Sequence, residues 1–258
     1  MISVLLPVFN PDIKNLVNCL NGICKSNYKN LEIIIIADLS AEYIQVDKLD
    51  CLINSFKRVL DIIIIKRIEK KGIASALNLG IQVSRGDFIA RIDADDISYE
   101  NRFSLQINAL KKYNATICYG LANSQDKKIL GKKMIPGNEI NDFTFQNPII
   151  HPSVMFRKKD IIKIGAYNED LDYCEDLDLW FRCIKNRLQF VCISEPVIMY
   201  TLPENGRHNK NWITNIVVRF THWKVLGIRR LIIGVICIFL YLLLPQNLKS
   251  FIYSRFTR

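Results

Sequence analysis

Three aspartates stand within four positions at the end of an apolar run. Asp93, Asp95 and Asp96 follow Phe88–Ile92 in the stretch ARIDADD. Carboxylates this close are costly to keep ionised together unless a cation joins them. Alternating aspartates in a loop suit a hard divalent cation such as Mg²⁺ or Mn²⁺, although one of them could instead accept a hydrogen bond from a ribose hydroxyl. We therefore predict a divalent metal site; the alternative is a solvated acidic turn that caps a helix starting near Ser98.

A second pair of acids, Glu175 and Asp176, stands at the start of a predicted helix over residues 176–187. A carboxylate there can take a proton from an attacking hydroxyl if the fold brings it near a metal-bound substrate. The helix dipole alone also explains acids in this position. A separate predicted metal site favours the catalytic interpretation.

A few other residues carry weaker signals. Asp38 follows an apolar run and could accept the imide N–H of a uracil or a sugar hydroxyl, or simply form a turn. Lys71, preceded by Lys70, could approach a phosphate, although lysines before a helix are usually only solvated. His208, in GRHNK, is a candidate metal or phosphate ligand, whereas His151 is predicted to be structural.

The elements that must position these residues alternate along the first half of the chain. Apolar runs without polar alternation, such as LEIIIIA, are typical of strands buried on both faces. Helical spacing of apolar residues separates the runs, beginning with Leu16, Leu20 and Ile23, for which Asn10 and Pro11 are the expected N-cap and first turn. This alternation predicts parallel strands joined by right-handed crossovers. The predicted strands are Ile2–Phe9, Leu31–Ala37, Ile62–Ile65 and Phe88–Ile92, and the later helices contain residues 49–60, 73–84 and 100–113.

In such a sheet, ligands bind beyond the carboxyl ends of the strands. Asn10, Asp38, Arg67 and the acids at 93–96 all follow predicted strands, so we expect them at one rim. One acidic cluster, one separate aspartate and a few cations there would suit a nucleotide diphosphate bound through a metal. Further strands are predicted at Thr116–Leu121, His151–Arg157 and Phe190–Ile193.

The charge of the chain is unevenly distributed. The net charge is +10, but residues 205–258 hold nine Lys and Arg and no acid, while the other 26 cations nearly balance the 25 acids of residues 1–204. The cations of the tail are mixed with apolar residues rather than set along a polar groove, which argues against nucleic-acid binding. We predict two parts, a domain over 1–204 and a basic, apolar membrane-associating segment over 205–258.

Within that segment, residues 231–244 form a run of fourteen without a charge. As a helix the run would be ~21 Å long, short of the ~30 Å hydrocarbon core, so we expect it to lie at the membrane surface rather than to span. The alternative is a helix packed on the core of the domain. The eight cysteines are scattered without a C-x-x-C pair, which indicates reduced, buried thiols of a cytosolic protein, and the N-terminus does not look like a signal peptide.

These pieces together resemble family 2 glycosyltransferases, the inverting enzymes of the GT-A fold. SVLLPVFN resembles the family's opening strand, and KGIASALNLGIQVSRGDFIARIDADDISYENR resembles the signature that runs into its D-x-D motif. NPIIHPSVMFRK and YCEDLDLWFR resemble the acceptor-side segment and the E-D motif. The second strand departs from the family pattern, because Ala37 replaces the first of two aspartates. The match runs in order over about residues 1–200.

The resemblance implies a role for each matching residue. Asp176 would be the catalytic base, with Glu175 orienting the site. Asp95 and Asp96 would contact ribose and metal, and His208 remains a further candidate metal ligand. The implied donor-binding residues are Pro7, Val8, Phe9, Asn10, Asp38, Lys71, Asn78, Asp93 and Asp95. The implied fold is α/β, a Rossmann-like, mostly parallel central sheet flanked by helices, followed by a basic apolar helical segment.

The implied reaction is inverting transfer of a sugar from a nucleotide-diphospho-sugar, a UDP-sugar, to a hydroxyl of a glycan acceptor. We expect a lipid-linked acceptor in bacterial surface-polysaccharide or O-antigen synthesis, and a protein held peripherally on the cytoplasmic face of the membrane. Two alternatives stay open. A metal-dependent nucleotidyltransferase would turn over nucleoside triphosphates, and a membrane-docked binding protein would bind the donor without transferring sugar.

Overall fold

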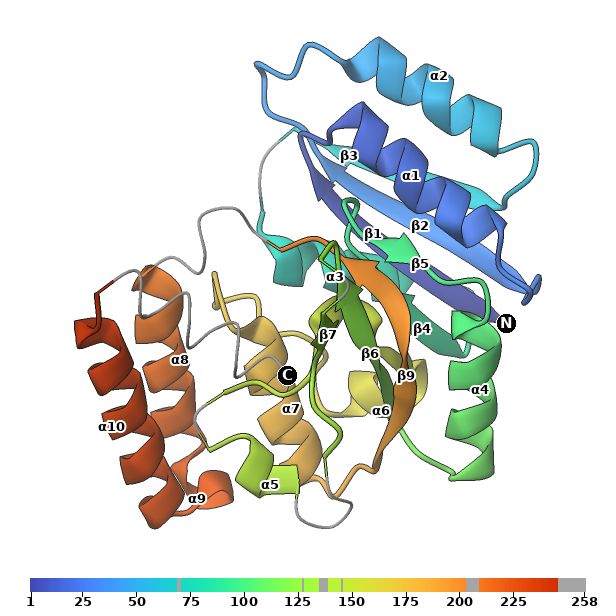
Figure 1. The fold of residues 1–258 in the computed structure, drawn as a ribbon. Helices are drawn as coiled ribbons and strands as arrows, with labels where there is room; N and C mark the ends of the chain where they lie inside the picture. Colours follow the sequence, from blue (N-terminus) through green and yellow to red (C-terminus); the bar gives the residue numbers. More distant parts are fainter. Residues whose placement is uncertain (69–70, 127, 135–138, 145, 203–208, 246–258) are drawn as a thin grey trace.

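The computed structural model describes residues 1–68, 71–126, 128–134, 139–144, 146–202 and 209–245 (Figure 1). The strands are β1 Ile2–Phe9, β2 Leu31–Asp38, β3 Ile62–Arg67, β4 Phe88–Arg91, β5 Ile97–Ser98, β6 Ile117–Ser124, β7 Ile129–Leu130, β8 Met155–Arg157 and β9 Phe190–Tyr200. The helices are α1 Ile13–Cys24, α2 Val46–Phe56, α3 Ile73–Val83, α4 Arg102–Lys112, α5 Glu139–Asp142, α6 Lys158–Lys163, α7 Glu175–Lys185, α8 Asn209–Thr221, α9 Trp223–Leu226 and α10 Ile228–Leu243, with a 3₁₀ turn at His151–Ser153.

One sheet runs through the molecule in the order β3-β2-β1-β4-β8-β6-β9-β5, and β7 pairs with β6. The first four strands of this order are parallel, with Ile2 opposite Leu31 and Phe88, and Ile33 opposite Ile62. β8 then pairs antiparallel with both β4 and β6, while β6 and β9 are parallel. The predicted mostly parallel α/β sheet is therefore confirmed.

Successive residues of the parallel strands face opposite layers. Val4 and Leu6 of β1 pack in the core formed with α1, α2 and α4, whereas Leu5 packs in the core formed with α3 and α7. Because helices cover both faces, most positions along these strands are apolar, which explains the runs of isoleucine in the sequence.

Four local predictions were wrong. The N-cap of α1 is Asp12, whose carboxylate accepts the N–H of Asn15 at 2.8 Å, and not Asn10. Residues 151–153 form a 3₁₀ turn rather than the start of a strand, because a proline without an N–H is poorly suited to a ladder. α2 ends at Phe56, before the predicted residue 60. All eight cysteines are free, but Cys51 and Cys237 are exposed rather than buried.

The helices α8 and α9 pack against α7, and α10 packs against α8 and α9 on the far side from α7 (Figure 1). The structure gives α10 two different sides. On one side Leu231, Gly234 and Ile238 are buried. At Gly234 a Cβ would lie 2.0 Å from the carbonyl oxygen of Thr144, so only glycine fits there. This is the packing that the sequence left open as the alternative to a surface-lying helix.

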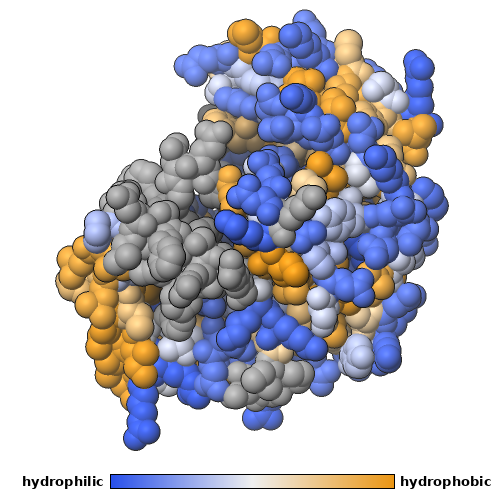
Figure 2. Space-filling view, viewed as in Figure 1, coloured by the Kyte–Doolittle hydropathy of each residue, from blue (hydrophilic) through white to orange (hydrophobic). Residues whose placement is uncertain are grey.

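The other side of α10 is exposed and apolar, and it forms a ridge in the space-filling view (Figure 2). The exposed apolar residues of α10 are Ile228, Ile232, Ile233, Ile236, Phe239, Leu240 and Leu243. Among the described residues, no helix combines the length and the hydropathy needed to cross a bilayer.

Candidate active site

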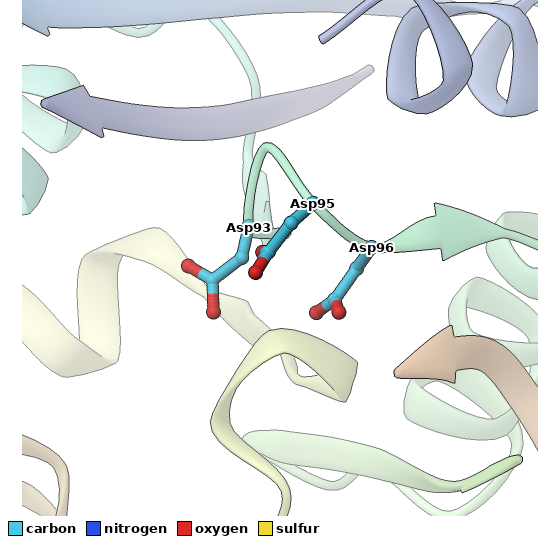
Figure 3. Close-up of side chains that lie close together, drawn as sticks. All are labelled: Asp93, Asp95 and Asp96. Atoms are coloured by element: carbon cyan, nitrogen blue, oxygen red, sulfur yellow. The ribbon is translucent and has the colours of Figure 1, made fainter. Parts of the chain in front are cut away.

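The three aspartates lie in the turn between β4 and β5, and one ligand oxygen from each lies within 4.8 Å of the others (Figure 3). The N–H of Asp96 donates to the carbonyl of Asp93 at 3.2 Å, which closes the turn. Thr201, just after β9, braces it from the opposite side by donating its hydroxyl to the carbonyl of Asp95 at 2.7 Å. The sequence prediction that these acids cluster at a strand end is thus confirmed in geometry.

Asp96 is the most constrained of the three. Its side chain is 0 % exposed, and its Oδ1 accepts the backbone N–H of Thr201 at 2.9 Å. Its Oδ2 has no hydrogen-bond partner among the residues that the structure describes. Burial, reinforced by the nearby charge of Asp93, raises the pKa of Asp96 to about 8. A buried carboxylate oxygen without a donor is suited to a divalent cation, so the residues present fit the predicted metal.

Arg91 neutralises the charge of Asp93. The two side chains form an ion pair, and Arg91 is only 4 % exposed. Burial raises the pKa of Asp93, while the charge of Arg91 opposes that rise. Since Asp93 is engaged by a protein cation, Asp95 and Asp96 are the acids more available for a metal.

The second acidic pair lies at the start of α7. Asp176 is half-buried, and its Oδ2 accepts the Nδ2–H of Asn147 at 2.6 Å. Its Oδ1 accepts the backbone N–H of Leu177 at 2.7 Å. The helix begins after Cys174, whose φ of 61° is left-handed. Both carboxylate oxygens are therefore held by groups of the protein.

Glu175, beside it, belongs to a buried cluster with His151 and Tyr167. Nε2 of His151 lies 2.9 Å from the hydroxyl oxygen of Tyr167, and Nδ1 lies 3.5 Å from Oε1 of Glu175. Burial, with the charge of Arg91 adding to it, lowers the pKa of His151 to about 3, so the ring is neutral at physiological pH. Burial also raises the pKa of Glu175. His151, which was predicted to be structural, is thus buried and bonded to Tyr167 beside Glu175.

Asp38, the last residue of β2, is buried and forms an ion pair with Arg67. Its carboxylate accepts hydrogen bonds from Nε and Nη2 of Arg67, the latter at 2.8 Å, and from the N–H of Lys71 at 3.2 Å. Asn10 has a φ of 42° and bridges β1 to β2, because its side chain hydrogen-bonds both the N–H and the hydroxyl of Ser40. The loops after these strands are thus joined to each other.

The remaining predicted donor residues differ in their surroundings. Phe9 is 48 % exposed, whereas Val8 is buried and Pro7 is half-buried. Asn78 hydrogen-bonds both backbone groups of Tyr167 and the carboxylate of Glu169, so in this structure it braces the Tyr167 segment. His208 and Lys70 lie outside the described residues.

A cleft of about 1230 Å³ is lined by residues of both acidic regions, although in the acidic loop Asp93 lines it and Asp95 and Asp96 do not. Lys71, Arg91 and Asp93 line one part of it, and Glu175 and Asp176 line another. A further, largely apolar part of the lining comes from α8, α10 and the residue after α10; it includes Trp212, Ile238, Leu240, Tyr241 and Leu244. Asn10, Asp38 and Asn78 do not line this cleft.

The family model for glycosyl transferase family 2 matches residues 3–165. The chain belongs to this family. It is 29% identical over 188 residues to the amylovoran biosynthesis glycosyltransferase AmsE of Erwinia amylovora, covering 70% of this chain and 69% of that protein. It is 27% identical over 274 residues to the UDP-Gal:alpha-D-GlcNAc-diphosphoundecaprenol beta-1,3-galactosyltransferase of Escherichia coli, covering 99% and 96% of the two chains.

Two solved structures share the fold of this glycosyltransferase. S. aureus TarS 1-349 in complex with UDP-GlcNAc has a TM-score of 0.68 at 14% identity, covering 87% of this chain and 70% of that one. The mannosyltransferase PcManGT from Pyrobaculum calidifontis, in complex with GDP-Man and Mn2+, has a TM-score of 0.64 at 15% identity, covering 86% and 63%. The predicted GT-A fold is confirmed by these similarities.

Sequence reasoning missed several residues that shape the site of this glycosyltransferase. Arg91 had a detectable signal, because it is a charge inside an otherwise apolar strand. Tyr167 and Thr201 carried no local signal, since Tyr167 bonds His151 and Thr201 bonds Asp96, both distant in the sequence. Asn147 begins the segment NPIIHPSVMFRK, but its bond to Asp176 could not be read from that segment.

Proposed function

We propose that this glycosyltransferase moves a sugar from a UDP-sugar to a hydroxyl of a glycan acceptor, with inversion at the anomeric carbon. The observation that carries the proposal is the single cleft that contains both Asp93 of the acidic loop and Asp176. A displacement needs the leaving group and the base on opposite sides of one carbon, and a shared cleft allows that arrangement. The E. coli relative, whose name includes a UDP-Gal donor, supports a UDP-sugar.

Asp176 is the general base of the proposed reaction. Its carboxylate accepts the proton of the acceptor hydroxyl as the acceptor oxygen bonds to the anomeric carbon. In the same step the bond from that carbon to the phosphate oxygen breaks, and the nucleoside diphosphate leaves with the electron pair. Asn147 and the N–H of Leu177 hold the carboxylate in place, and buried Glu175 precedes it.

Asp95 and Asp96 would hold a divalent cation, Mg²⁺ or Mn²⁺. The unpartnered Oδ2 of Asp96 supports this assignment among the described residues. A bound cation would neutralise negative charge on the diphosphate. Asp93 is paired with Arg91 and would contact the donor. The assignment of His208 as a further ligand stays a prediction.

The acceptor that we propose is amphiphilic, a glycan on a lipid carrier used in surface-polysaccharide synthesis. The cleft is lined both by polar residues such as Asp176 and by apolar residues of α8 and α10, so it suits a molecule with a polar and an apolar part. The names of the two relatives, amylovoran biosynthesis and a diphosphoundecaprenol acceptor, support the same class.

We further propose that residues 205–258 hold the domain of residues 1–204 at the cytoplasmic face of the membrane. The exposed apolar ridge of α10 lies in a segment with nine cations and no acid, which suits an anionic lipid surface (Figure 2). Deleting the helix would also remove buried packing, so point substitutions on the ridge are the sharper test. Ile236, Phe239 and Leu243 are exposed there and do not line the cleft.

The test of transfer uses a GlcNAc-diphosphate lipid as acceptor and a panel of UDP-sugars with Mn²⁺. We expect one UDP-sugar to be consumed with formation of a glycosylated lipid, and chelator to abolish the reaction. Donor binding without any transfer, or turnover of nucleoside triphosphates instead of sugar transfer, would contradict the proposal.

The test of membrane association is sedimentation with phosphatidylglycerol-containing vesicles. Replacing Ile236, Phe239 and Leu243 by serine should weaken binding by about 10-fold or more, because apolar surface no longer enters the lipid. The matched control replaces Ile44 and Val59, which are exposed on a different part of the molecule, by serine and should bind normally. Equal binding by both variants would refute the role of the ridge.

A further inference from the structure

Arg91 is a buried cation whose hydrogen-bonding capacity is only partly used. One terminal nitrogen, Nη2, is paired with Asp93. Nε and Nη1 are buried and have no hydrogen-bond partner in the part of the chain that the structure describes. Buried donors of a charged group without acceptors are strongly disfavoured, so such a group in a native protein needs an explanation.

The backbone of Arg91 is held by hydrogen bonds. The unpartnered nitrogens of its side chain are therefore not explained by a poorly positioned strand. Its N–H donates to the carbonyl of Val154 at 3.1 Å, and its carbonyl accepts Nη2 of buried Arg102 at 2.7 Å. These bonds lie in the centre of the sheet, where β4 pairs with β1 and β8. The strand therefore delivers the side chain to one defined place.

That place is the wall of the cleft between its two acidic regions. Arg91 lines the cleft and is paired with Asp93 on the side of the acidic loop. It is also close enough to Glu175 for its charge to stabilise that carboxylate in the ionised form. In the proposed reaction the transferred sugar must lie between the diphosphate and Asp176, so Arg91 is on the part of the wall that such a sugar would face.

We propose that Arg91 binds the transferred sugar by donating hydrogen bonds from Nε and Nη1 to its hydroxyl oxygens. This inference rests on the proposed function. The ion pair with Asp93 already balances the charge of Arg91, so a neutral polyol is a better match than a further anion such as the diphosphate. Since Nη2 is paired with Asp93, the free donors Nε–H and Nη1–H lie on different sides of the planar guanidinium, and each can donate to a different hydroxyl group.

The experiment compares the binding of UDP with that of a UDP-sugar, because the two differ only in the part that Arg91 would contact. Calorimetry with Mn²⁺ is carried out on wild type and Arg91→Lys, which keeps the charge beside Asp93 but removes the guanidinium. The probe is UDP-galactose or UDP-N-acetylglucosamine, whichever the wild type binds more tightly. We expect the substitution to weaken binding of the UDP-sugar by about 10- to 100-fold and that of UDP by less than about 3-fold.

The matched control is Arg219→Lys. Arg219 is also fully buried and has an unpartnered Nη2 within the described residues, but it does not line the cleft. We expect this variant to lower the melting temperature and to leave both affinities unchanged. If Arg91→Lys does not fold, Arg91→Gln, which retains a smaller amide donor, is measured in the same way.

The outcomes separate the inference from the proposed function. Equal weakening of UDP and UDP-sugar, or no weakening of either, would overturn the role of Arg91 while leaving the transferase proposal in place. A wild-type protein that binds no nucleotide or nucleotide-sugar would overturn both. The inference is supported if Arg91→Lys weakens binding of the UDP-sugar much more than binding of UDP, and Arg219→Lys weakens neither.

Discussion

The two acidic regions of the candidate site differ in how completely the protein satisfies their polar groups. At the end of β4 two nitrogens of Arg91, and in the following loop Oδ2 of Asp96, have no partner among the described residues. At the start of α7, both oxygens of Asp176 accept hydrogen bonds from Asn147 and Leu177. The loop thus has capacity left for a ligand, whereas the carboxylate of α7 is positioned by the protein itself.

The difference matches the two halves of the proposed chemistry. Charge that develops on a leaving diphosphate is balanced by groups that the bound donor and its cation complete. A general base, in contrast, is most effective when its geometry is fixed before the acceptor arrives. Changes in the loop should therefore affect donor binding, and changes at α7 should affect the rate of transfer.

The largest effect on donor binding is expected from Asp96→Asn. The amide keeps the hydrogen bond to Thr201 but removes the negative charge that would bind a cation. We expect Mn²⁺-dependent UDP-galactose affinity to fall by about 100-fold, close to 2.7 kcal/mol. Calorimetry with and without Mn²⁺ measures this. Unchanged metal-dependent affinity would remove the distinction between the two regions, since Asp96 would then not be part of a donor site.

A smaller effect is expected on stability as the pH changes. Because the folded-state pKa of Asp96 is raised to about 8, above an unfolded value of about 3.9, ionisation of this group opposes folding. Without divalent metal, the free energy of unfolding should fall as the pH rises from about 4 to about 8, because this carboxyl must then ionise in a buried site. Urea unfolding at several pH values measures it.

In Asp96→Asn the fall in the free energy of unfolding that is due to Asp96 should be absent. In wild type at pH 8, added Mn²⁺ should restore stability, because it binds the folded state. The difference between wild type and variant isolates Asp96 from other titrating groups. Identical pH profiles for the two proteins would show that the buried oxygen is not the source of the effect.

The smallest of these effects is expected from Asn147→Ala. Its amide holds one oxygen of Asp176, and the N–H of Leu177 still holds the other. We expect kcat to fall by about 10-fold with donor affinity unchanged, because only the orientation of the base is loosened. Steady-state kinetics separate the two parameters. A loss of donor affinity instead would mean that α7 contributes to the donor half as well.

Much of the fold was predictable because its signals are local. Runs of β-branched residues such as Ile33–Ile36 are typical of strands covered on both sides, and the spacing of Leu16, Leu20 and Ile23 marks one buried helix face. The errors arose where tertiary contacts determine the local structure. Asn10 resembles a cap, but its side chain bonds Ser40, a residue that only β-sheet formation brings close.

The candidate site was predictable to a similar extent. The acids of the loop and of α7 could be found because they follow a strand and begin a helix. The residues that bond these acids could not be found, since Asn147 and Thr201 are distant in the sequence from Asp176 and Asp96 and form no sequence pattern with them. Arg91 shows the intermediate case, a charge in a buried strand whose purpose becomes clear only from its pairing with Asp93.

The most direct test of the account is to measure donor binding and sugar transfer together in Asp176→Asn. We expect the variant to bind UDP-galactose with Mn²⁺ as tightly as wild type, within about 3-fold, and to transfer sugar about 1000-fold more slowly. Asp170→Asn, a change of the same kind at an exposed aspartate, should match wild type in both. Transfer by Asp176→Asn at the wild-type rate would contradict the account.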